Sequence, residues 1–292
     1  MKKMIGGSFM RSWGNHPHYP WTFCFKCRGV LTTLAILTLL GACKSPAVIF
    51  DQTADSLGLQ RDVVMGTVFQ HVLFWRKGWP TRTLRIYLGG DGTPVSAGRP
   101  AIDPTPRNPL MLRLMLLDPD PAVYVGRPCY HGLAGTAGCS GDLWTSARSS
   151  ESVGSSLAAA IRRIMISRGY ERIFLFGYSG GGTLAMLLAE RFLEARAIVT
   201  IAANLDIDAW ADHHGQDRLT TSLNPASRPP LCTGILERHY AGSRDRIVPA
   251  TLTSLGVRGP NAELIVIDDY DHVCCWTELW PTILADIAAA ER

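Results

Sequence analysis

The sequence predicts an α/β protein with a mostly parallel central sheet and helices on both faces of that sheet. Short apolar segments typical of strands alternate with segments in which apolar residues recur at helical spacing. The strand segments are continuous apolar runs rather than alternating ones, which is typical of parallel strands buried on both faces. Residues 66–292 keep this pattern without a repeat or a linker, so we expect a single domain there.

The expected elements follow one another in a simple order. Strands are expected at 66–75, 84–88, 122–125, 172–176, 197–202, 233–239 and 264–267. Helices are expected at 110–117, 149–168, 181–193 and 273–290. Residues 205–232 are polar and break the alternation, so we interpret them as a small lid or cap insertion.

The composition excludes several classes of protein. Of the 292 residues, 47% are hydrophobic and only 18% are charged, which argues against a disordered chain. No uninterrupted apolar run approaches the roughly 18 residues that a membrane-spanning helix needs. The net charge of +4 comes from scattered arginines rather than a basic block, so we expect no nucleic-acid partner.

The N-terminus has the order of a secretory signal. Residues 30–42 read VLTTLAILTLLGA, with Lys26 and Arg28 before them and Cys43 after them. The last residues of this stretch, LGAC, resemble the bacterial lipobox, in which the signal is cut before a lipidated cysteine. We therefore predict a lipoprotein signal peptide at 1–42, a lipid such as palmitate on Cys43, and a tether at 43–65. The alternatives are an ordinary cleavable signal or a short buried helix.

Export would place the cysteines of the mature chain in an oxidising compartment, where they become disulfide candidates. These candidates are Cys129, Cys139, Cys232, Cys274 and Cys275. We prefer a bond between Cys129 and Cys139, because they bracket a short Gly-rich loop. Cys232 would then pair with Cys274 or Cys275 and leave one thiol free, although sequence alone does not determine connectivity.

Ser179 lies in the sequence GYSGGG, directly after an apolar strand and before an apolar helix. This is the G-x-S-x-G pattern of a nucleophile elbow, in which glycines make room for a serine held in a strained strand-to-helix turn. The amide of Gly180 would begin the helix and point at the same place, as a hydrogen-bond donor to an oxyanion. The alternative is a plain Gly-rich turn or a phosphate-binding loop.

A serine nucleophile needs a base, and the base needs a third group to orient it. Two later strands supply the candidates in the order serine, acid, histidine. We assign Asp245, in GSRDRIVP, as the orienting acid and His272, in DYDH, as the general base. Asp206 and Asp208 remain weaker alternatives for the acid.

A second oxyanion donor is expected in the loop after the strand at 84–88, which reads LGGDG. The amide of Asp91 is the first candidate, with Gly90 or Gly92 as alternatives. A carboxylate pointing inward would repel the developing oxyanion. We therefore expect the Asp91 side chain to be turned away and held by local hydrogen bonds.

Taken together, GYSGG, GSRDRIVP and DYDH resemble the α/β-hydrolase superfamily over residues 66–292. More narrowly, IYLGGDG, VGRPC, LWTSAR, AANLDIDAW and SLNPA look like a group of exported bacterial α/β-hydrolases of mostly unassigned substrate. The resemblance implies the α/β-hydrolase fold and a Ser-Asp-His triad. The oxyanion loop departs from the pattern of esterases because it lacks the histidine of HGGG.

These observations predict a lipid-anchored serine hydrolase of the bacterial cell envelope, carboxylesterase- or lipase-like, that cleaves a carboxylic ester or thioester of a small molecule or lipid. Such a triad needs no metal or organic cofactor, and the adjacent His213 and His214 lack further spaced ligands. Two other functions remain open. One is acyl transfer by the same triad, and the other is a non-catalytic envelope lipoprotein that uses the hydrolase scaffold as a binding module.

Overall fold

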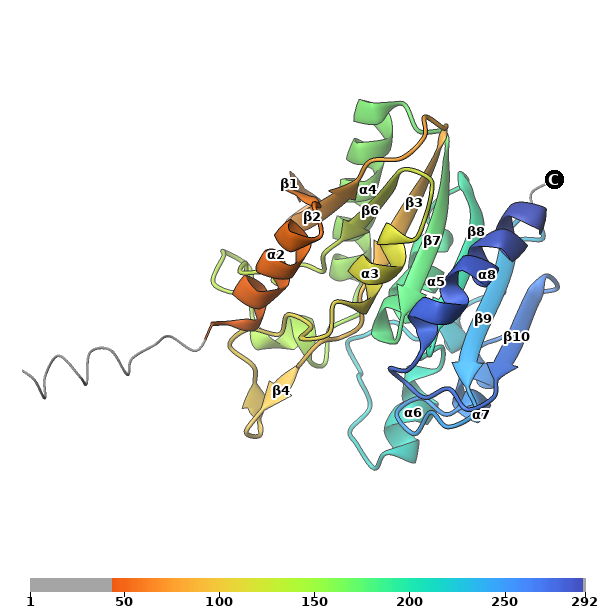
Figure 1. The fold of residues 1–292 in the computed structure, drawn as a ribbon. Coiled ribbons are helices and arrows are strands. Elements are labelled where there is room, and N and C mark those ends of the chain that lie inside the picture. The colour runs from red at the N-terminus through yellow and green to blue at the C-terminus, as the bar shows by residue number, and fades with distance from the viewer. Residues whose placement is uncertain (1–43, 291–292) are drawn as a thin grey trace, which may run out of the picture. The chain divides into compact units, whose positions relative to one another are not determined.

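The computed structural model describes residues 44–290. Eight strands of this part form one sheet, with helices on both faces (Figure 1). The sheet strands are β1 Gln60–Met65, β2 Gln70–Arg76, β3 Thr83–Leu88, β6 Ala122–Val125, β7 Arg172–Tyr178, β8 Ala195–Ile201, β9 Leu236–Gly242 and β10 Ala262–Ile267. The helices are α2 Pro46–Ser56, α3 Leu110–Leu116, α4 Glu151–Arg168, α5 Gly180–Ala189, α6 Ile207–His213, α7 Ala250–Leu255 and α8 Trp276–Ala290.

The strand order in the sheet is β1-β2-β6-β3-β7-β8-β9-β10. Strands β3 and β6 to β10 run parallel, whereas β2 is antiparallel to both of its neighbours. A two-stranded hairpin, β4 Val95–Ser96 and β5 Arg99–Pro100, stands apart from this sheet. The predicted fold class is therefore correct. The carboxyl ends of the parallel strands meet at one edge, where ligands bind in open α/β sheets.

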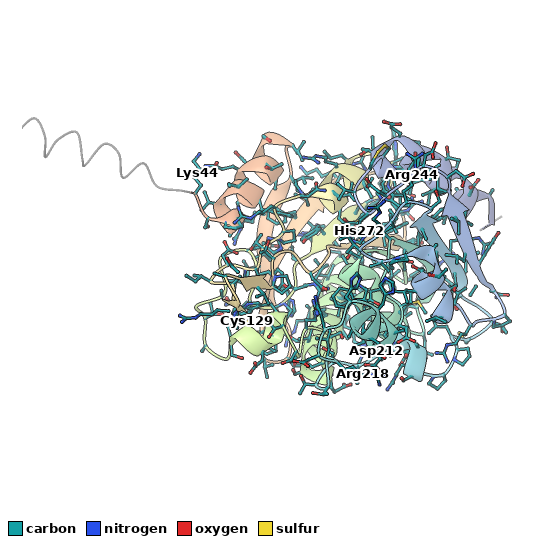
Figure 2. All side chains as sticks on the ribbon, turned by 90° about the horizontal axis from the view of Figure 1, so that it is seen from below. Lys44, Cys129, Asp212, Arg218, Arg244 and His272 are labelled. Atoms are coloured by element: carbon teal, nitrogen blue, oxygen red, sulfur yellow. A yellow bond between two sulfur atoms is a disulfide. The ribbon has the colours of Figure 1, made fainter. Side chains whose placement is uncertain are left out.

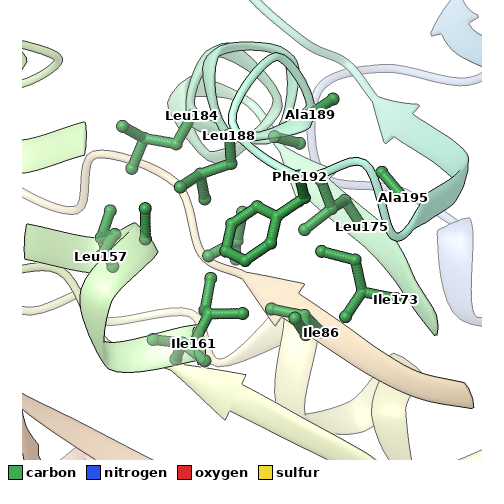
Figure 3. Packing of buried hydrophobic residues seen from close by; sticks show 14 of the residues in the cluster. Ile86, Leu157, Ile161, Ile173, Leu175, Leu184, Leu188, Ala189, Phe192 and Ala195 are labelled. Atoms are coloured by element: carbon green, nitrogen blue, oxygen red, sulfur yellow. The ribbon is translucent and has the colours of Figure 1, made fainter. Parts of the chain in front are cut away.

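Two apolar layers hold the helices against the sheet. On one face, α4 and α5 pack over the central strands, and Figure 3 shows Phe192 of this layer among Leu188, Ile161 and Ile173. On the other face, α2, α3 and α8 cover the sheet. Full burial of an aliphatic or aromatic side chain stabilises the fold by about 2 kcal/mol.

The longest helix of the first layer shows how local sequence determines an element. In α4 the apolar residues recur at helical spacing and are buried, among them Leu157, Ile161 and Ile164. The helix ends at Gly169, which has φ of 71° and donates its N–H to the carbonyl of Met165. Glycine is favoured here because a side chain makes this left-handed conformation unfavourable.

The tether predicted at 43–65 is wrong for residues 44–65, because they belong to the compact domain. They form α2 and the edge strand β1, which pairs with β2. The helix buries Ala47, Phe50 and Ala54, and the Phe50 ring lies 5.5 Å from that of Phe74. Its apolar face is narrow and β1 is mostly exposed, so neither gave a clear periodic signal. Cys43 lies outside the described residues.

The cysteines pair only partly as expected. Cys129 and Cys139 form a disulfide with their Cα atoms 5.7 Å apart, which is the preferred pairing. Cys274 and Cys275 are bonded to each other, and Cys232 is exposed and has no disulfide partner within residues 44–290. The expected bond from Cys232 to Cys274 or Cys275 is therefore wrong. Strands β9 and β10 are parallel neighbours, so Cys232, which precedes β9, and the two cysteines that follow β10 lie toward opposite ends of these strands.

Candidate active site

Ser179 stands in the turn between β7 and α5, at φ of 53° and ψ of −124°. A non-glycine residue in such a backbone conformation costs about 1–3 kcal/mol and persists only where its surroundings impose it. Here the neighbouring backbone does so. A Cβ at Gly177 would lie 2.4 Å from the carbonyl oxygen of Gly181, so only glycine allows the strand and the helix to approach this closely.

Three side chains from separate loops form a hydrogen-bonded line. The Nε2 atom of His272 lies 3.1 Å from Oγ of Ser179, and its Nδ1 atom lies 2.8 Å from Oδ2 of Asp245. Asp245 follows β9 and His272 follows β10, so both loops leave the same edge of the sheet as Ser179. The structure thus brings together the serine, acid and histidine that the sequence analysis selected.

The carboxylate of Asp245 is fixed by its own loop. Its side chain is fully buried, and Oδ1 accepts hydrogen bonds from the backbone N–H groups of Ile247 and Val248, both at 2.8 Å. Oδ2 is left to face Nδ1 of His272. The loop therefore positions one oxygen of the carboxylate for the histidine by satisfying the other.

The two alternative acids have structural roles instead. Asp206 caps α6, where Oδ1 accepts from the N–H groups of Asp208 and Ala209. The amide of Asn224 donates to both carboxylates, at 2.8 Å to Asp206 and 2.9 Å to Asp208. These contacts stabilise the segment after β8. Asp245, and neither of these two residues, is the acid that contacts His272.

The two candidate oxyanion donors lie beside the serine. Gly180 is the first residue of α5, where backbone N–H groups lack helical acceptors and the helix dipole favours negative charge. The loop after β3 also passes close to the serine, since a Cβ at Gly90 would lie 3.3 Å from Cβ of Ser179.

The Asp91 side chain departs from the expectation. Its carboxylate is not turned away, because a Cβ at Gly180 would meet Oδ1 of Asp91 at 2.0 Å. Nor is it held by local hydrogen bonds: Arg127 contacts Oδ1 at 2.6 Å and Arg148 contacts Oδ2 at 3.0 Å. The two guanidinium groups thus compensate the negative charge with which the Asp91 carboxylate would otherwise repel an oxyanion.

The electrostatics of this cluster keep the carboxylate charged. Burial alone would raise the pKa of Asp91, but the charges of Arg127 and Arg148 outweigh burial and hold its pKa below the usual value. The carbonyl of Asp91 also accepts a hydrogen bond from the hydroxyl of Tyr130 at 2.9 Å. Tyr130 lies next to Cys129, so the disulfide loop supports the oxyanion loop.

Sequence reasoning missed these supporting residues. Arg127, Tyr130 and Arg148 come from the region after β6, and they contact Asp91 across 36 to 57 positions of sequence. The only signal for the two arginines was the VGRPC and LWTSAR segments of the family resemblance, which carried no assigned role, and Tyr130 directly follows the first of these segments.

A cavity of about 1030 Å³ opens beside Ser179 and His272. Its apolar wall comes from several loops and from α2, and includes Phe50, Pro94, Val95, Pro109, Met111, Tyr124, Tyr178, Trp210 and Val248. Phe50 was also missed, because α2 was taken for a tether. The cavity is large enough for an apolar chain of a small-molecule or lipid substrate.

Part of the segment 205–232 lines this cavity, through Trp210 and residues 215–219. The indole N–H of Trp210 donates to the carbonyl of Ile247 at 2.7 Å, and Nε2 of His214 lies 2.9 Å from the same oxygen. His214 is thus used to attach the segment to the loop of Asp245. No cluster of three or more potential metal-ligating side chains occurs in the described part of the chain. None of its helices is long and apolar enough to span a bilayer.

Comparisons with known proteins agree with this architecture. No family model and no curated protein matches the sequence. Among solved structures, mouse alpha/beta hydrolase domain-containing protein 10 is 12% identical, with a TM-score of 0.57 over 80% of this chain and 100% of that chain. An esterase of Pyrococcus furiosus is 13% identical, with a TM-score of 0.55 over 80% of this chain and 93% of that chain.

A membrane phospholipase A, described as a bacterial virulence factor, extends the agreement further along the chain. It is 14% identical, with a TM-score of 0.53 over 90% of this chain and 97% of that chain. At such identities the likeness concerns the fold. From the strand order, the elbow after β7 and these solved structures, we conclude that the chain has the α/β-hydrolase fold.

Proposed function

We propose that this protein is a serine hydrolase that cleaves a carboxylic ester or thioester through an acyl-enzyme on Ser179. The observation that carries the proposal is the hydrogen-bonded line from Ser179 through His272 to Asp245. A serine hydroxyl is a weak nucleophile at neutral pH, and an adjacent oriented imidazole is the usual means of activating it.

In the proposed reaction, Nε2 of His272 takes the proton of Ser179 as Oγ attacks the carbonyl carbon. Asp245 holds His272 in the tautomer that leaves Nε2 free to accept, and it stabilises the imidazolium that forms. The protonated His272 then delivers its proton to the leaving alcohol or thiol. Water then attacks the acyl carbonyl carbon and gives a proton to His272, and His272 returns that proton to Oγ of Ser179 as the acyl–oxygen bond breaks and the acid leaves.

The oxyanion would be stabilised by the N–H of Gly180 and by an amide of the loop after β3, with Asp91 as the first candidate. Each such donor contributes about 10²–10³ to kcat in well-studied hydrolases. The paired arginines are part of this proposal, because without them the Asp91 carboxylate would oppose the negative charge that develops beside Gly180.

The cavity supports an ester with an apolar acyl or alcohol part, since aromatic and aliphatic side chains form part of its wall. An esterase and a phospholipase A among the similar solved structures are compatible with that chemistry. We also propose that the segment 205–232 acts as a lid or cap, and that the protein is exported to the bacterial cell envelope and anchored by a lipid on Cys43. Palmitate labelling that disappears in Cys43→Ser would support the anchor, and labelling that persists would contradict it.

The test of the nucleophile is labelling with a fluorophosphonate probe, which requires no knowledge of the substrate. We expect the wild-type protein and Ser146→Ala to be labelled and Ser179→Ala to remain unlabelled. Ser146 is a matched control because it lines the same cavity. Equal labelling of Ser179→Ala would contradict the assignment, and folded wild-type protein that does not react would favour the binding-module alternative.

A panel of esters with increasing acyl length then defines the substrate. Analysis of the products distinguishes hydrolysis, which releases the free acid, from transfer of the acyl group to an added alcohol.

A further inference from the structure

Four apolar side chains are exposed near the point where the chain enters the domain. Ile102 is 95% exposed, and Val95, Val48 and Ile49 are 53%, 44% and 41% exposed. We call these four residues the entrance patch. Scattered exposed apolar residues are normal, so the patch is informative only if its members are neighbours and if the surface has a definite relation to the site.

Two hydrogen bonds bring the segments that carry these residues together. The N–H of Ala47, in the first turn of α2, donates to Oδ2 of Asp103 at 2.8 Å, which brings Ile102 next to Val48 and Ile49. The N–H of Ala101 donates to the carbonyl of Pro94 at 2.9 Å. That bond continues the β4–β5 hairpin and brings Val95 to the same surface.

The entrance patch borders the mouth of the cavity. Val95 and its neighbour Pro94 line the cavity, as does Phe50 from the buried face of α2. In Figure 1 the β4 hairpin lies at the lower side of the molecule, toward the carboxyl ends of the parallel strands, and α2 begins at the left edge, above the hairpin. Figure 2 looks from that side, with His272 near the middle of the view and Lys44 where the chain enters.

Both signs of charge occur around the entrance patch. Lys44, Arg99 and Arg107 are exposed, and Arg107 also lines the cavity. Of the acids in the same segments, Asp51 pairs with Arg61 at 3.2 Å, Asp103 accepts the N–H of Ala47, and Asp55 is exposed on α2. Exposed cations beside an apolar surface are able to contact the headgroups of anionic lipids.

The sequence before the domain identifies the occupant of this surface. Residues 30–42 are apolar and end at Cys43, which directly precedes Lys44. A lipid on Cys43, or the apolar segment itself if it is retained, would hold a bilayer within a few residues of the entrance patch. A second copy of the chain or a protein partner would have no such reason to lie at this place.

We infer that the entrance patch rests on a lipid bilayer and that the cavity receives its substrate, a long-chain acyl ester of a membrane lipid, directly from that bilayer. The inference about the substrate rests on the proposed hydrolase activity, whereas the contact with the bilayer rests on the proposed anchor at Cys43 and not on that activity. Ile102 would enter the interface most deeply, because it is the most exposed member and its side chain lines no part of the cavity.

The contact is tested with the full, lipidated protein reconstituted in vesicles of phosphatidylcholine and phosphatidylglycerol. An environment-sensitive fluorophore is attached at Ile102→Cys in a Cys232→Ser background, which removes the free thiol found within residues 44–290. The matched control is Leu193→Cys, because Leu193 is 94% exposed and lies beyond the end of α5 that is remote from Ser179.

We expect the emission at position 102 to shift to shorter wavelength on vesicles and to be quenched by lipid-borne quenchers, with no change at position 193. Equal behaviour of the two positions would overturn the inference. So would a shift at position 102 that needs no vesicles and accompanies dimerisation in sedimentation, because a second copy would then cover the entrance patch.

The delivery of substrate is tested by activity, with Ile102→Asp compared with Leu193→Asp. We expect Ile102→Asp to hydrolyse a soluble short-chain ester within twofold of wild type, but to cleave phosphatidylglycerol in vesicles at least about tenfold more slowly. Leu193→Asp should match wild type in both assays. An unchanged vesicle rate in Ile102→Asp would overturn delivery from the bilayer, whereas a wild-type protein inactive on both esters would instead refute the proposed function.

Discussion

Replacement of Asp245 by Asn should leave His272 in place but change which of its ring nitrogens carries the proton. In the wild-type protein, Oδ1 of Asp245 accepts two backbone N–H groups at 2.8 Å, so the amide oxygen of an asparagine must take that place. Its NH₂ group then faces Nδ1 of His272, at the position now held by Oδ2. Because two donors cannot share that contact, Nδ1 must be unprotonated and Nε2 must carry the proton.

His272 in that tautomer presents a hydrogen to Oγ of Ser179 instead of a lone pair, at the 3.1 Å contact. It can no longer act as the base. The same substitution in serine proteases lowers kcat about 10⁴-fold, which corresponds to about 5 kcal/mol at 1.36 kcal/mol per factor of ten. We therefore expect Asp245→Asn to lose about 10⁴-fold in kcat for a soluble ester, with KM nearly unchanged.

The assay is steady-state hydrolysis of a short-chain chromogenic ester, with urea unfolding of each variant to confirm the fold. Asp206→Asn is the matched control, because it keeps an acceptor oxygen for the cap of α6 and should retain activity within about twofold. The reasoning is refuted if Asp245→Asn keeps more than about a tenth of the wild-type rate. It is also refuted if Asp206→Asn is the variant that loses activity while remaining stably folded.

Two further predictions concern the oxyanion loop and the acid sensitivity of the fold. Gly180→Ala should lower kcat at least about 100-fold, because the new Cβ would lie 2.0 Å from Oδ1 of Asp91 and displace the oxyanion loop. Gly154→Ala is the control and should stay active in the same assay, because its Cβ would meet only the end of the Arg191 side chain. His71 is fully buried, and burial lowers its pKa to about 4 although a hydrogen bond to Gly126 opposes the shift. The unfolded state therefore binds this proton first as pH falls below about 6.5, and the free energy of unfolding should drop by up to about 3 kcal/mol between that pH and about 4. Urea unfolding at pH 7 and pH 5 measures this loss. The free energy of unfolding should fall less between the two pH values in His71→Gln than in the wild type, and an equal fall in both proteins would contradict the assignment of this proton to His71.

The sheet was predictable where strands are buried on both faces. The segments of β6 and β7 were found nearly at their observed bounds because they are continuous apolar runs. At the sheet edge this signal fails: β1 is mostly exposed, and the segment predicted as a strand at 66–75 forms a strand only from Gln70. The strand predicted at 233–239 similarly begins at Leu236, because a turn precedes it.

The candidate site was predictable where chemistry and chain order coincide. Ser179, Asp245 and His272 each follow a strand of the parallel sheet, so their neighbourhood could be inferred from topology. The arginines that neutralise Asp91 could not be inferred, because ion pairs between distant loops leave no periodic pattern in a sequence. The contribution of Phe50 to the cavity was missed for a different reason, since it depends on how α2 packs against the domain.

Helix α2 contributes to the cavity beside Ser179 and also follows the proposed anchor site with almost no linker between them. Its residue Phe50 forms part of the cavity wall, and its start at Pro46 lies only three positions after Cys43. With a lipid on Cys43, as proposed, Ser179 would stay close to the surface of the membrane that holds the anchor. The enzyme would then process molecules of its own leaflet and leave those of a facing membrane untouched, and lengthening the chain before Pro46 would widen that reach.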